Sequence, residues 1–182
     1  MRLDKILEAD ARISSKLLHK ESKGLWHSIS VFFAHSGDSW FWFAALILIW
    51  FFGNDAWHNR SAFLSVGLAI LAVLVLLMKF TIKRRRPEGE WGNIYRATDP
   101  HSFPSGHAAR AAALAVMAFG VGPFWFAVSL ALWAPLVGIA RVRLGVHFLS
   151  DVIVGWLIGI MTGIIALATL PLIQTLVPFI FR

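Results

Sequence analysis

The stretch from Ser61 to Ile82 reads SAFLSVGLAILAVLVLLMKFTI, and it decides the class of fold. Its only charged residue is Lys79, close to the C-terminal end. A helix of roughly 20 predominantly apolar residues crosses the hydrocarbon core of a bilayer. We therefore expect this stretch to form a transmembrane helix that carries a lysine at one membrane surface.

Four other apolar segments flank this stretch, and we expect each of them to span the membrane as well: 39–53, 105–121, 124–143 and 148–170. Residues 24–36 are shorter and more polar, which predicts a partly inserted helix. Residues 3–20 place apolar and charged side chains on opposite sides, which predicts an amphipathic helix in the membrane interface. The expected fold class is all-α: an integral membrane bundle of five to six transmembrane helices with an N-terminal amphipathic interfacial helix.

The composition agrees with a membrane protein. Of 182 residues, 58% are hydrophobic and 15% are charged, whereas soluble domains carry about 25% charged residues. We expect one membrane-embedded domain over residues 1–182, with an N-terminal region at 1–37 and the chemistry within 79–151. The chain has no cysteine, which excludes disulfides and thiolate metal sites.

The net charge of +7 restricts the class of partner. In a soluble protein such a charge suggests nucleic acid. Here the basic residues adjoin membrane segments, so the bilayer and its anionic head groups are the expected partner, and nucleic acid is not. The alternative is that these Lys and Arg residues only set the membrane topology.

Five spans bring three polar stretches to one membrane face, because helix 61–82 ends, and helix 105–121 begins, on the side where 124–143 ends and 148–170 begins. The first stretch holds Lys79 and Arg86, which are seven residues apart. Two helical turns would let both project towards one place. Arginine offers a planar fork for phosphate oxygens and lysine a mobile charge. The alternative is an ordinary basic cluster at a membrane edge.

The second stretch is Pro104-Ser105-Gly106-His107. Ser105 is a natural N-cap, and the free N–H groups at a helix start form an anion site. His107 would stand in the first turn beside that anion.

The third stretch runs from Arg141 to Asp151 and contains His147. His147 and Asp151 are four residues apart, so they would share one helix face. A carboxylate that binds one imidazole nitrogen fixes the tautomer and strengthens the other nitrogen as a nucleophile. The alternative is an Asp that caps the helix beside an interfacial His.

Together these patterns, K-x(6)-R-P, P-S-G-H and R-x(5)-H-x(3)-D, resemble the signature of the type 2 phosphatidic acid phosphatase superfamily. The resemblance implies that His147 is the nucleophile and forms a phosphohistidine, that Asp151 orients it, and that His107 is the general acid. It further implies phosphate binding without metal or cofactor by these residues: Lys79, Arg86, Ser105, Gly106 and Arg141. One departure is Ala140, where the family has Ser, and we expect it to reduce support for Arg141 without loss of activity.

Other residues are candidate contacts to the substrate's head group. Arg110 lies one turn beyond His107, where it would bind a head group or second phosphate, or form a structural contact. The loop 87–103 is the longest between spans, which suggests a lid or a substrate-binding loop, and it carries Trp91 and Tyr95.

The resemblance implies a bacterial or archaeal membrane phosphatase that resembles undecaprenyl-diphosphatases and phosphatidylglycerophosphatases. We favour an isoprenoid phosphate or diphosphate as substrate, with phosphatidate, phosphatidylglycerophosphate or a glycolipid phosphate as alternatives. The competing class is an anion-binding or transport protein without catalysis, but such a protein has no need of the His147–Asp151 pair.

Two further questions stay open at this point. The resemblance implies a site on the outer side of the membrane, where most members of that superfamily act, whereas the excess of Lys and Arg on the site's side predicts a cytoplasmic site. The residues Gly155, Gly159 and Gly163 form a small-residue ridge, which serves either packing inside the bundle or a homodimer.

Overall fold

The computed structural model describes residues 2–18, 24–88, 91–92, 94 and 99–182. Within these ranges the regular elements are helices, and one isolated bridge pairs Arg85 with His101. The elements in chain order are α1 Arg2–Leu17, α2 Leu25–Ser36, α3 Ser39–Phe52, α4 Asp55–Ile82, α6 Gly106–Val121, α7 Phe124–Arg143, α8 Leu149–Ala168, α9 Leu170–Leu176 and the 3₁₀ turn η1 Pro178–Ile180.

Most of the expected segments are found, with shifted ends that local chemistry explains. Helix α4 begins before Ser61 because the Asn54 side chain accepts a hydrogen bond from Trp57 N at 3.0 Å and caps the helix at Asp55. It ends at Ile82, where Lys83 adopts a left-handed conformation with φ 53°. Helix α8 ends at Ala168 instead of running to residue 170, and α9 follows with a proline in its first turn.

The all-helical membrane bundle is confirmed, whereas the expected five to six spans remain a prediction. Among the described residues, α4, α7 and α8 are long and apolar enough to cross a membrane. Helices α2 and α3 qualify only together, as a pair bent by 57°, so α3 alone is too short for the span expected at 39–53, and the partial insertion expected for 24–36 remains a prediction. Helix α6 is apolar but has only 16 residues.

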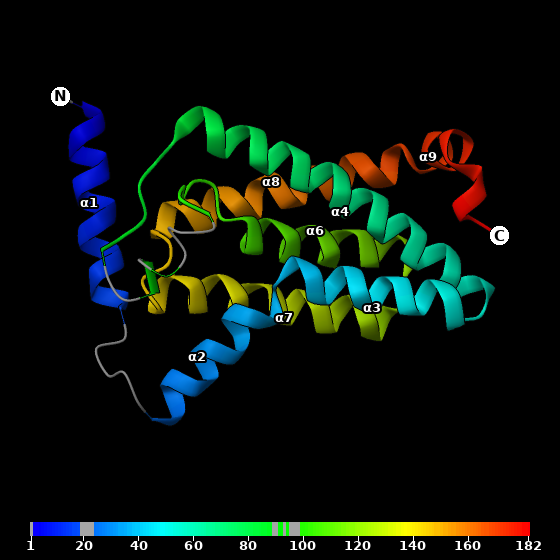
Figure 1. The fold of residues 1–182 in the computed structure, drawn as a ribbon, viewed down its shortest axis with the longest axis horizontal. Coiled ribbons are helices and arrows are strands. Elements are labelled where there is room, and N and C mark those ends of the chain that lie inside the picture. The colour runs from blue at the N-terminus through cyan, green and yellow to red at the C-terminus, as the bar shows by residue number, and fades with distance from the viewer. Residues whose placement is uncertain (1, 19–23, 89–90, 93, 95–98) are drawn as a thin grey trace.

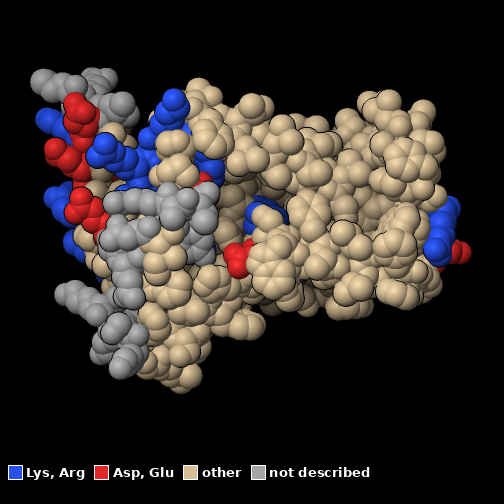
Figure 2. All heavy atoms as spheres, in the orientation of Figure 1, with Lys and Arg blue, Asp and Glu red and all other residues tan. Residues whose placement is uncertain are grey.

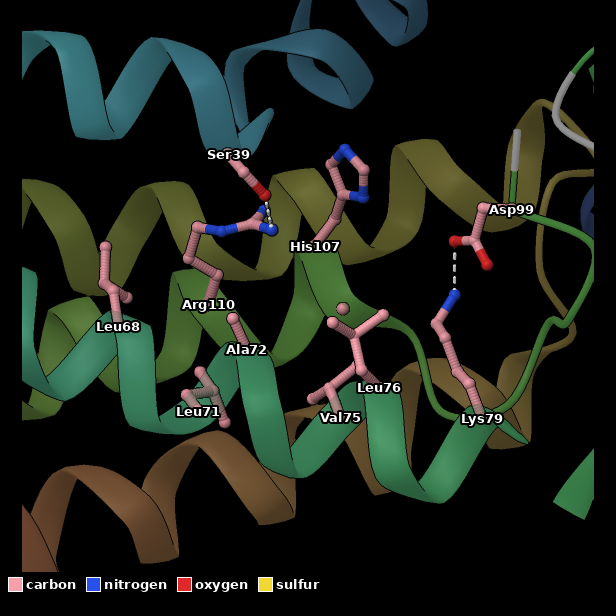
Figure 3. A pocket seen from close by; sticks show the side chains of 11 residues that line it. Ser39, Leu68, Leu71, Ala72, Val75, Leu76, Lys79, Asp99, His107 and Arg110 are labelled. Atoms are coloured by element: carbon pink, nitrogen blue, oxygen red, sulfur yellow. Dashed lines mark hydrogen bonds and ion pairs between the residues drawn. The ribbon is translucent and has the colours of Figure 1, made fainter. Parts of the chain in front are cut away.

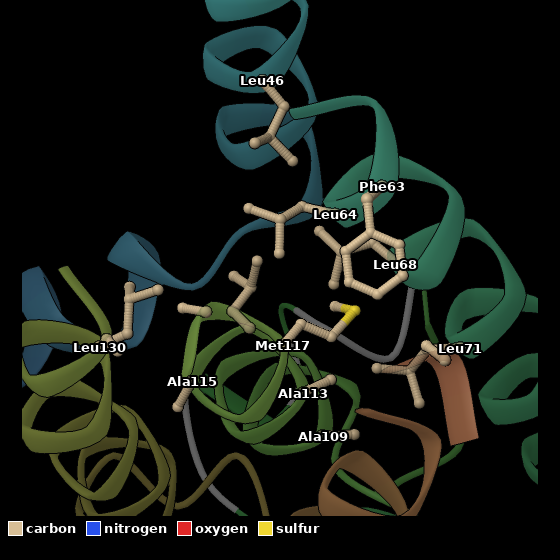
Figure 4. Packing of buried hydrophobic residues seen from close by; sticks show 14 of the residues in the cluster. Leu46, Phe63, Leu64, Leu68, Leu71, Ala109, Ala113, Ala115, Met117 and Leu130 are labelled. Carbon is tan, nitrogen blue, oxygen red and sulfur yellow. The ribbon is translucent and has the colours of Figure 1, made fainter. Parts of the chain in front are cut away.

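Helix α6 lies at the centre of the bundle, and its alanine-rich sequence allows α8 to approach closely. A Cβ added at Gly159 would lie 2.1 Å from the Ala109 carbonyl oxygen, and one at Gly155 would lie 2.6 Å from the Ser105 carbonyl oxygen. The glycine ridge therefore packs against α6, which was one of its two expected uses. On the other side of α6, Met117 packs among leucines of α4 (Figure 4).

The long helices run along one axis, and α1 lies across one end of the bundle (Figure 1). At this end, which we call the motif end, α4 and α7 terminate and α6 and α8 begin. Charged side chains gather at the motif end and some show towards the middle of the view, a few lie at the opposite end, and an uncharged band lies between the middle and that opposite end (Figure 2). This distribution is what a bilayer around that band requires.

Candidate active site

The three polar stretches meet at the motif end, as the parity of spans predicted. Helix α4 supplies Lys79, α6 supplies His107, α7 supplies Arg141, and Asp151 lies in the first turn of α8. Several of the charged or titratable side chains at this end are buried: Lys79, Arg86, Arg141, His147 and Asp151. Because burying charged groups is costly without compensation, such a cluster marks a functional site.

Lys79 and Arg86 converge on one carboxylate, that of Asp99. Lys79 Nζ forms an ion pair with Asp99 Oδ2 (Figure 3). It also donates to the His101 carbonyl oxygen at 2.9 Å. Arg86 Nη2 lies 2.8 Å from Asp99 Oδ2, and Arg86 Nε donates to the Asp99 carbonyl oxygen at 2.7 Å. The two cations therefore form an anion site, which a carboxylate of the loop occupies.

The predicted convergence of Lys79 and Arg86 is confirmed, but the predicted route is wrong. The helix does not continue for two turns to Arg86, because α4 stops at Ile82 and the chain turns at Lys83. Arg86 reaches the site from the extended segment that pairs with His101. The sequence carried no signal for Asp99, since no helical spacing relates that loop to the two cations.

His147 lies between α7 and α8 with its two ring nitrogens in different surroundings. Nε2 lies 3.3 Å from Arg86 Nη1, and because a guanidinium can only donate, Nε2 is the acceptor. The ring proton then lies on Nδ1, which is 3.5 Å from Asp151 Oδ2, at ion-pair distance but too far for a hydrogen bond. Burial lowers the pKa of His147, and the charges of Arg141, Arg86 and Lys79 lower it further. The imidazole is therefore neutral at neutral pH, with a lone pair on Nε2.

Asp151 is held in place by groups other than His147. Its Oδ1 accepts from Arg84 Nη1 at 2.7 Å, and its Oδ2 accepts from Phe148 N at 2.9 Å. The first of these partners was not predicted, because Arg84 looks like one more basic residue in the run before Pro87. Asp151 thus both caps the start of α8 and faces His147, two roles that the sequence offered as alternatives.

His107 also has a carboxylate partner, which the sequence did not reveal. Its Nε2 lies 2.7 Å from Asp38 Oδ1. The other oxygen of Asp38 lies 3.2 Å from His35 Nδ1. Asp38 stands in the break between α2 and α3, and no spacing in the sequence connects that break with the start of α6.

The Ser105 N-cap is confirmed, since its Oγ accepts from Ala108 N at 3.5 Å. The backbone N–H of Ser105 donates to the Asp151 carbonyl oxygen at 2.9 Å, which ties the start of α6 to α8. Arg110 donates to the Gly37 carbonyl oxygen and to Ser39 Oγ, so it has the structural contacts that were one of its two expected uses.

Trp91 and Tyr95 are the two loop aromatics proposed as head-group contacts. Trp91 packs against His35, with ring centroids 5.8 Å apart, and against the cluster around Ala140. Tyr95 lies outside the described residues.

A cavity of about 210 Å³ adjoins these groups (Figure 3). Lys79, Asp99, His107 and Arg110 form its polar wall, and Leu68, Leu71, Val75 and Leu76 of α4 contribute to its apolar wall. A cavity with these two walls suits a molecule with an anionic head and an apolar chain. In the part of the chain that the structure describes, no three His, Asp or Glu side chains gather as a metal site would need.

Two solved structures share this fold. The crystal structure of LpxE from Aquifex aeolicus superposes with a TM-score of 0.69 and 28% identity, covering 86% of this chain and 93% of that one. The crystal structure of a PAP2-type phosphatidylglycerolphosphate phosphatase from Bacillus subtilis gives a TM-score of 0.70 and 26% identity, covering 89% and 84%.

Sequence comparison also finds similarity to a lipid phosphatase. An undecaprenyl-diphosphatase from Sulfolobus acidocaldarius is 29% identical over 148 residues, which are 79% of this chain and 70% of that protein. The pattern of the PAP2 superfamily matches residues 60–174, more than half of the chain and all three polar stretches. The chain therefore belongs to the PAP2 superfamily, as one of its membrane lipid phosphatases.

Proposed function

We propose that this protein hydrolyses a phosphate ester or diphosphate bond on a membrane lipid through a phosphohistidine at His147. The observation that carries the proposal is the arrangement of His147. Its Nε2 faces the buried cations as an acceptor, and its Nδ1 faces Asp151. Such an imidazole combines an unprotonated Nε2, whose lone pair can attack once the substrate phosphate draws Arg86 away, with a carboxylate that stabilises the charge formed on attack.

In the first step, His147 Nε2 attacks phosphorus and the bond to the leaving oxygen breaks. His107, protonated on both ring nitrogens, gives its Nδ1 proton to that oxygen, so the lipid leaves as an alcohol, or as a monophosphate if the substrate is a diphosphate. In the second step, His107 takes a proton from water, and the water oxygen attacks phosphorus and breaks the phosphorus–nitrogen bond. Inorganic phosphate leaves, and both histidines return to their starting states.

The phosphate-binding roles are assigned to Lys79, Arg86 and Arg141, with help from Ser105 and the backbone at Gly106. The first two cations already hold an anion, the Asp99 carboxylate. Substrate phosphate would displace that carboxylate and gain the same charge-assisted contacts. Arg141 is buried, and its charge lowers the pKa of His147, which supports a phosphate-binding role near the attacking imidazole.

For the substrate, we propose an isoprenoid phosphate or diphosphate. The support is the similarity to a protein named undecaprenyl-diphosphatase and the apolar wall that α4 gives the cavity. The alternatives are phosphatidate, phosphatidylglycerophosphate and a glycolipid phosphate. The B. subtilis neighbour is named for the second of these.

The test is phosphate release by the purified protein in detergent from a panel of lipid phosphates and diphosphates. His147→Ala should abolish release from every substrate, because the attacking atom is lost. His27→Ala, which changes a histidine of α2 outside the site, is the matched control and should keep its activity. Turnover by His147→Ala at the wild-type rate would refute the proposed mechanism.

The membrane face of the site has two conflicting indications. The charge at the motif end favours the cytoplasm, whereas the superfamily resemblance favours the outer face. We propose the cytoplasmic face from the charge. Labelling of Trp91→Cys by an impermeant thiol reagent in intact cells would contradict this proposal, and labelling only after permeabilisation would support it.

A further inference from the structure

Helix α1 contacts the active site although it lies outside residues 60–174, the part matched by the superfamily pattern. Leu149 N donates to Ser14 Oγ at 2.9 Å, and Ser150 N donates to Asp10 Oδ1 at 3.1 Å. These are two of the N–H groups that the start of a helix leaves without partners. The residue before α8 is Phe148, whose side chain has no oxygen to accept from them. Helix α1 thus caps α8 from another part of the chain.

Arg84 connects this cap to the catalytic carboxylate. Its Nη2 lies 2.7 Å from Asp10 Oδ2, and its Nη1 lies 2.7 Å from Asp151 Oδ1. The guanidinium also lies over the Phe148 ring, 4.1 Å from the centroid. The guanidinium therefore bridges two carboxylates and contacts the connection that carries His147.

This bridge has a geometric consequence for His147. Arg84 holds Oδ1 of Asp151, and the other oxygen, Oδ2, is the one that faces His147 Nδ1 at 3.5 Å. Fixing one oxygen of a carboxylate fixes the direction of the other. Without the bridge, only the hydrogen bond from Phe148 N to Oδ2 would orient the carboxylate, so it could tilt relative to the imidazole.

The bridge also has an electrostatic consequence. One guanidinium shared by Asp10 and Asp151 leaves the cluster with one net negative charge. If Asp10 were neutral, Arg84 would pair with Asp151 alone, and the carboxylate would stabilise the positive charge that forms on His147 less well.

We propose that Asp10 and Arg84 are positioning residues, so that α1 completes the active site by holding Asp151 against His147. The inference rests on the proposed role of His147 as nucleophile. It assigns to helix α1 a part in the attack on phosphorus, in addition to the interfacial position expected from its amphipathic sequence.

The first test is Asp10→Asn in the full-length protein, assayed in detergent with one lipid phosphate. We expect kcat to fall about tenfold and KM to stay within about twofold, because the phosphate-binding cations are unchanged. The rate of phosphohistidine formation in a rapid-quench experiment should fall with kcat. Glu8→Gln, which neutralises an exposed acid on the same helix, is the matched control and should leave both constants unchanged.

A double-mutant cycle distinguishes the bridge from two unrelated effects. Arg84→Lys keeps the charge, but one ammonium group does not reproduce the planar fork that spans both carboxylates. The single variants should each lose about tenfold, and the double variant should lose little more, because both break the same bridge. Losses that multiply in the double variant would overturn the proposal.

A purely structural role for α1 is tested with Ser14→Ala, which removes a cap of α8 and leaves Asp10 and Arg84 in place. We expect a lower melting temperature and a kcat within about twofold of wild type. An equal loss of kcat in Ser14→Ala and Asp10→Asn would show that docking of α1, and not the bridge, is what matters. A fully active Asp10→Asn beside an inactive His147→Ala would refute this inference alone, whereas an active His147→Ala would refute the proposed function itself.

Discussion

At His147 the carboxylate partner comes from the same short segment, four residues along the chain, whereas at His107 it comes from Asp38, which lies 69 residues away in the chain. The first pair is fully buried and 3.5 Å apart. The second is partly exposed and 2.7 Å apart. His147 precedes the first residue of α8, so the expectation that it shares a helix face with Asp151 is wrong, although four residues of separation still made the pair visible in the sequence. A pair that depends on the packing of α2 on α7 and of α3 on α4 leaves no such trace.

The two rings also present different nitrogens to the site. At His147, Arg86 leaves Nε2 as the acceptor. At His107, the Asp38 carboxylate can only accept, so Nε2 carries a proton and Nδ1 is the nitrogen left for a leaving group. The arrangement thus fits one histidine that attacks and one that exchanges a proton, and the predictions below test that division.

The largest expected difference is between His147→Ala and His107→Ala in a single turnover with radiolabelled lipid phosphate. His147→Ala should give no acid-labile phosphate on the protein. His107→Ala should form it, but roughly 10²–10⁴-fold more slowly than wild type, because a general acid contributes that much. Covalent phosphate on His147→Ala, or its complete absence from His107→Ala with an activated aryl phosphate, would reverse the assignment.

The next effect is that of Asp38→Asn, which should depend on the leaving group. With an alkyl phosphate, whose leaving oxygen needs a proton, we expect a loss of about 10–100-fold in kcat. With p-nitrophenyl phosphate, whose leaving group needs little help, the loss should be less than about threefold. The matched control is Asp55→Asn, which removes an exposed acid at the opposite end of the bundle. Equal losses with both substrates would mean that Asp38 is only structural.

Much of the fold followed from hydropathy, since each expected apolar segment coincides with a helix. The early start of α4 could also have been predicted, because Asn54-Asp55 before an apolar run is a helix-start signal. The sequence could not predict that α2 and α3 form a bent pair, because length and polarity alone do not distinguish a partly inserted helix from half of a broken span.

In the site, the sequence indicated candidate residues that lie close together in the chain, such as His147 and Asp151, and it missed the partners that come from elsewhere in the chain. Asp10, Arg84, Asp38 and Asp99 each act through a contact between segments distant in sequence. Such contacts depend on how the helices pack, and one sequence contains no periodic signal for them. Arg84 was visible only as part of a basic run, which is commonly a topology signal.

A smaller effect is expected on the pH dependence of kcat/KM. His147 must be neutral to attack, and burial with the nearby charges of Arg141, Arg86 and Lys79 lowers its pKa. The loss of activity in acid should therefore lie below the ordinary histidine value of about 6.5. Lys79→Gln removes one cation, so the pKa of His147 should rise, and the acid limb should move to higher pH.

The shift is measured as the pH at which kcat/KM falls to half of its maximum, because Lys79→Gln also weakens phosphate binding and so lowers that maximum. Arg86, Arg141 and Asp151 still face the imidazole in the variant, so the shift should be partial. Titration of the substrate phosphate is the same for both proteins and cancels in the comparison. Lys83→Gln changes an exposed lysine at the end of the same helix, and its profile should match that of wild type. An acid limb that moves to lower pH in Lys79→Gln would contradict the assignment of His147.

The smallest expected effect is that of Ala140→Ser, which restores the hydroxyl that the superfamily resemblance led us to expect. Ala140 is buried in an apolar cluster with Ala34, Leu144 and Val146, close to the end of α7. A serine hydroxyl there would donate a hydrogen bond to a carbonyl oxygen of the preceding helical turn, which adds little net stability. We expect kcat/KM within about threefold of wild type. A gain of more than about tenfold would mean that the missing hydroxyl weakens Arg141 and that apolar packing does not replace it.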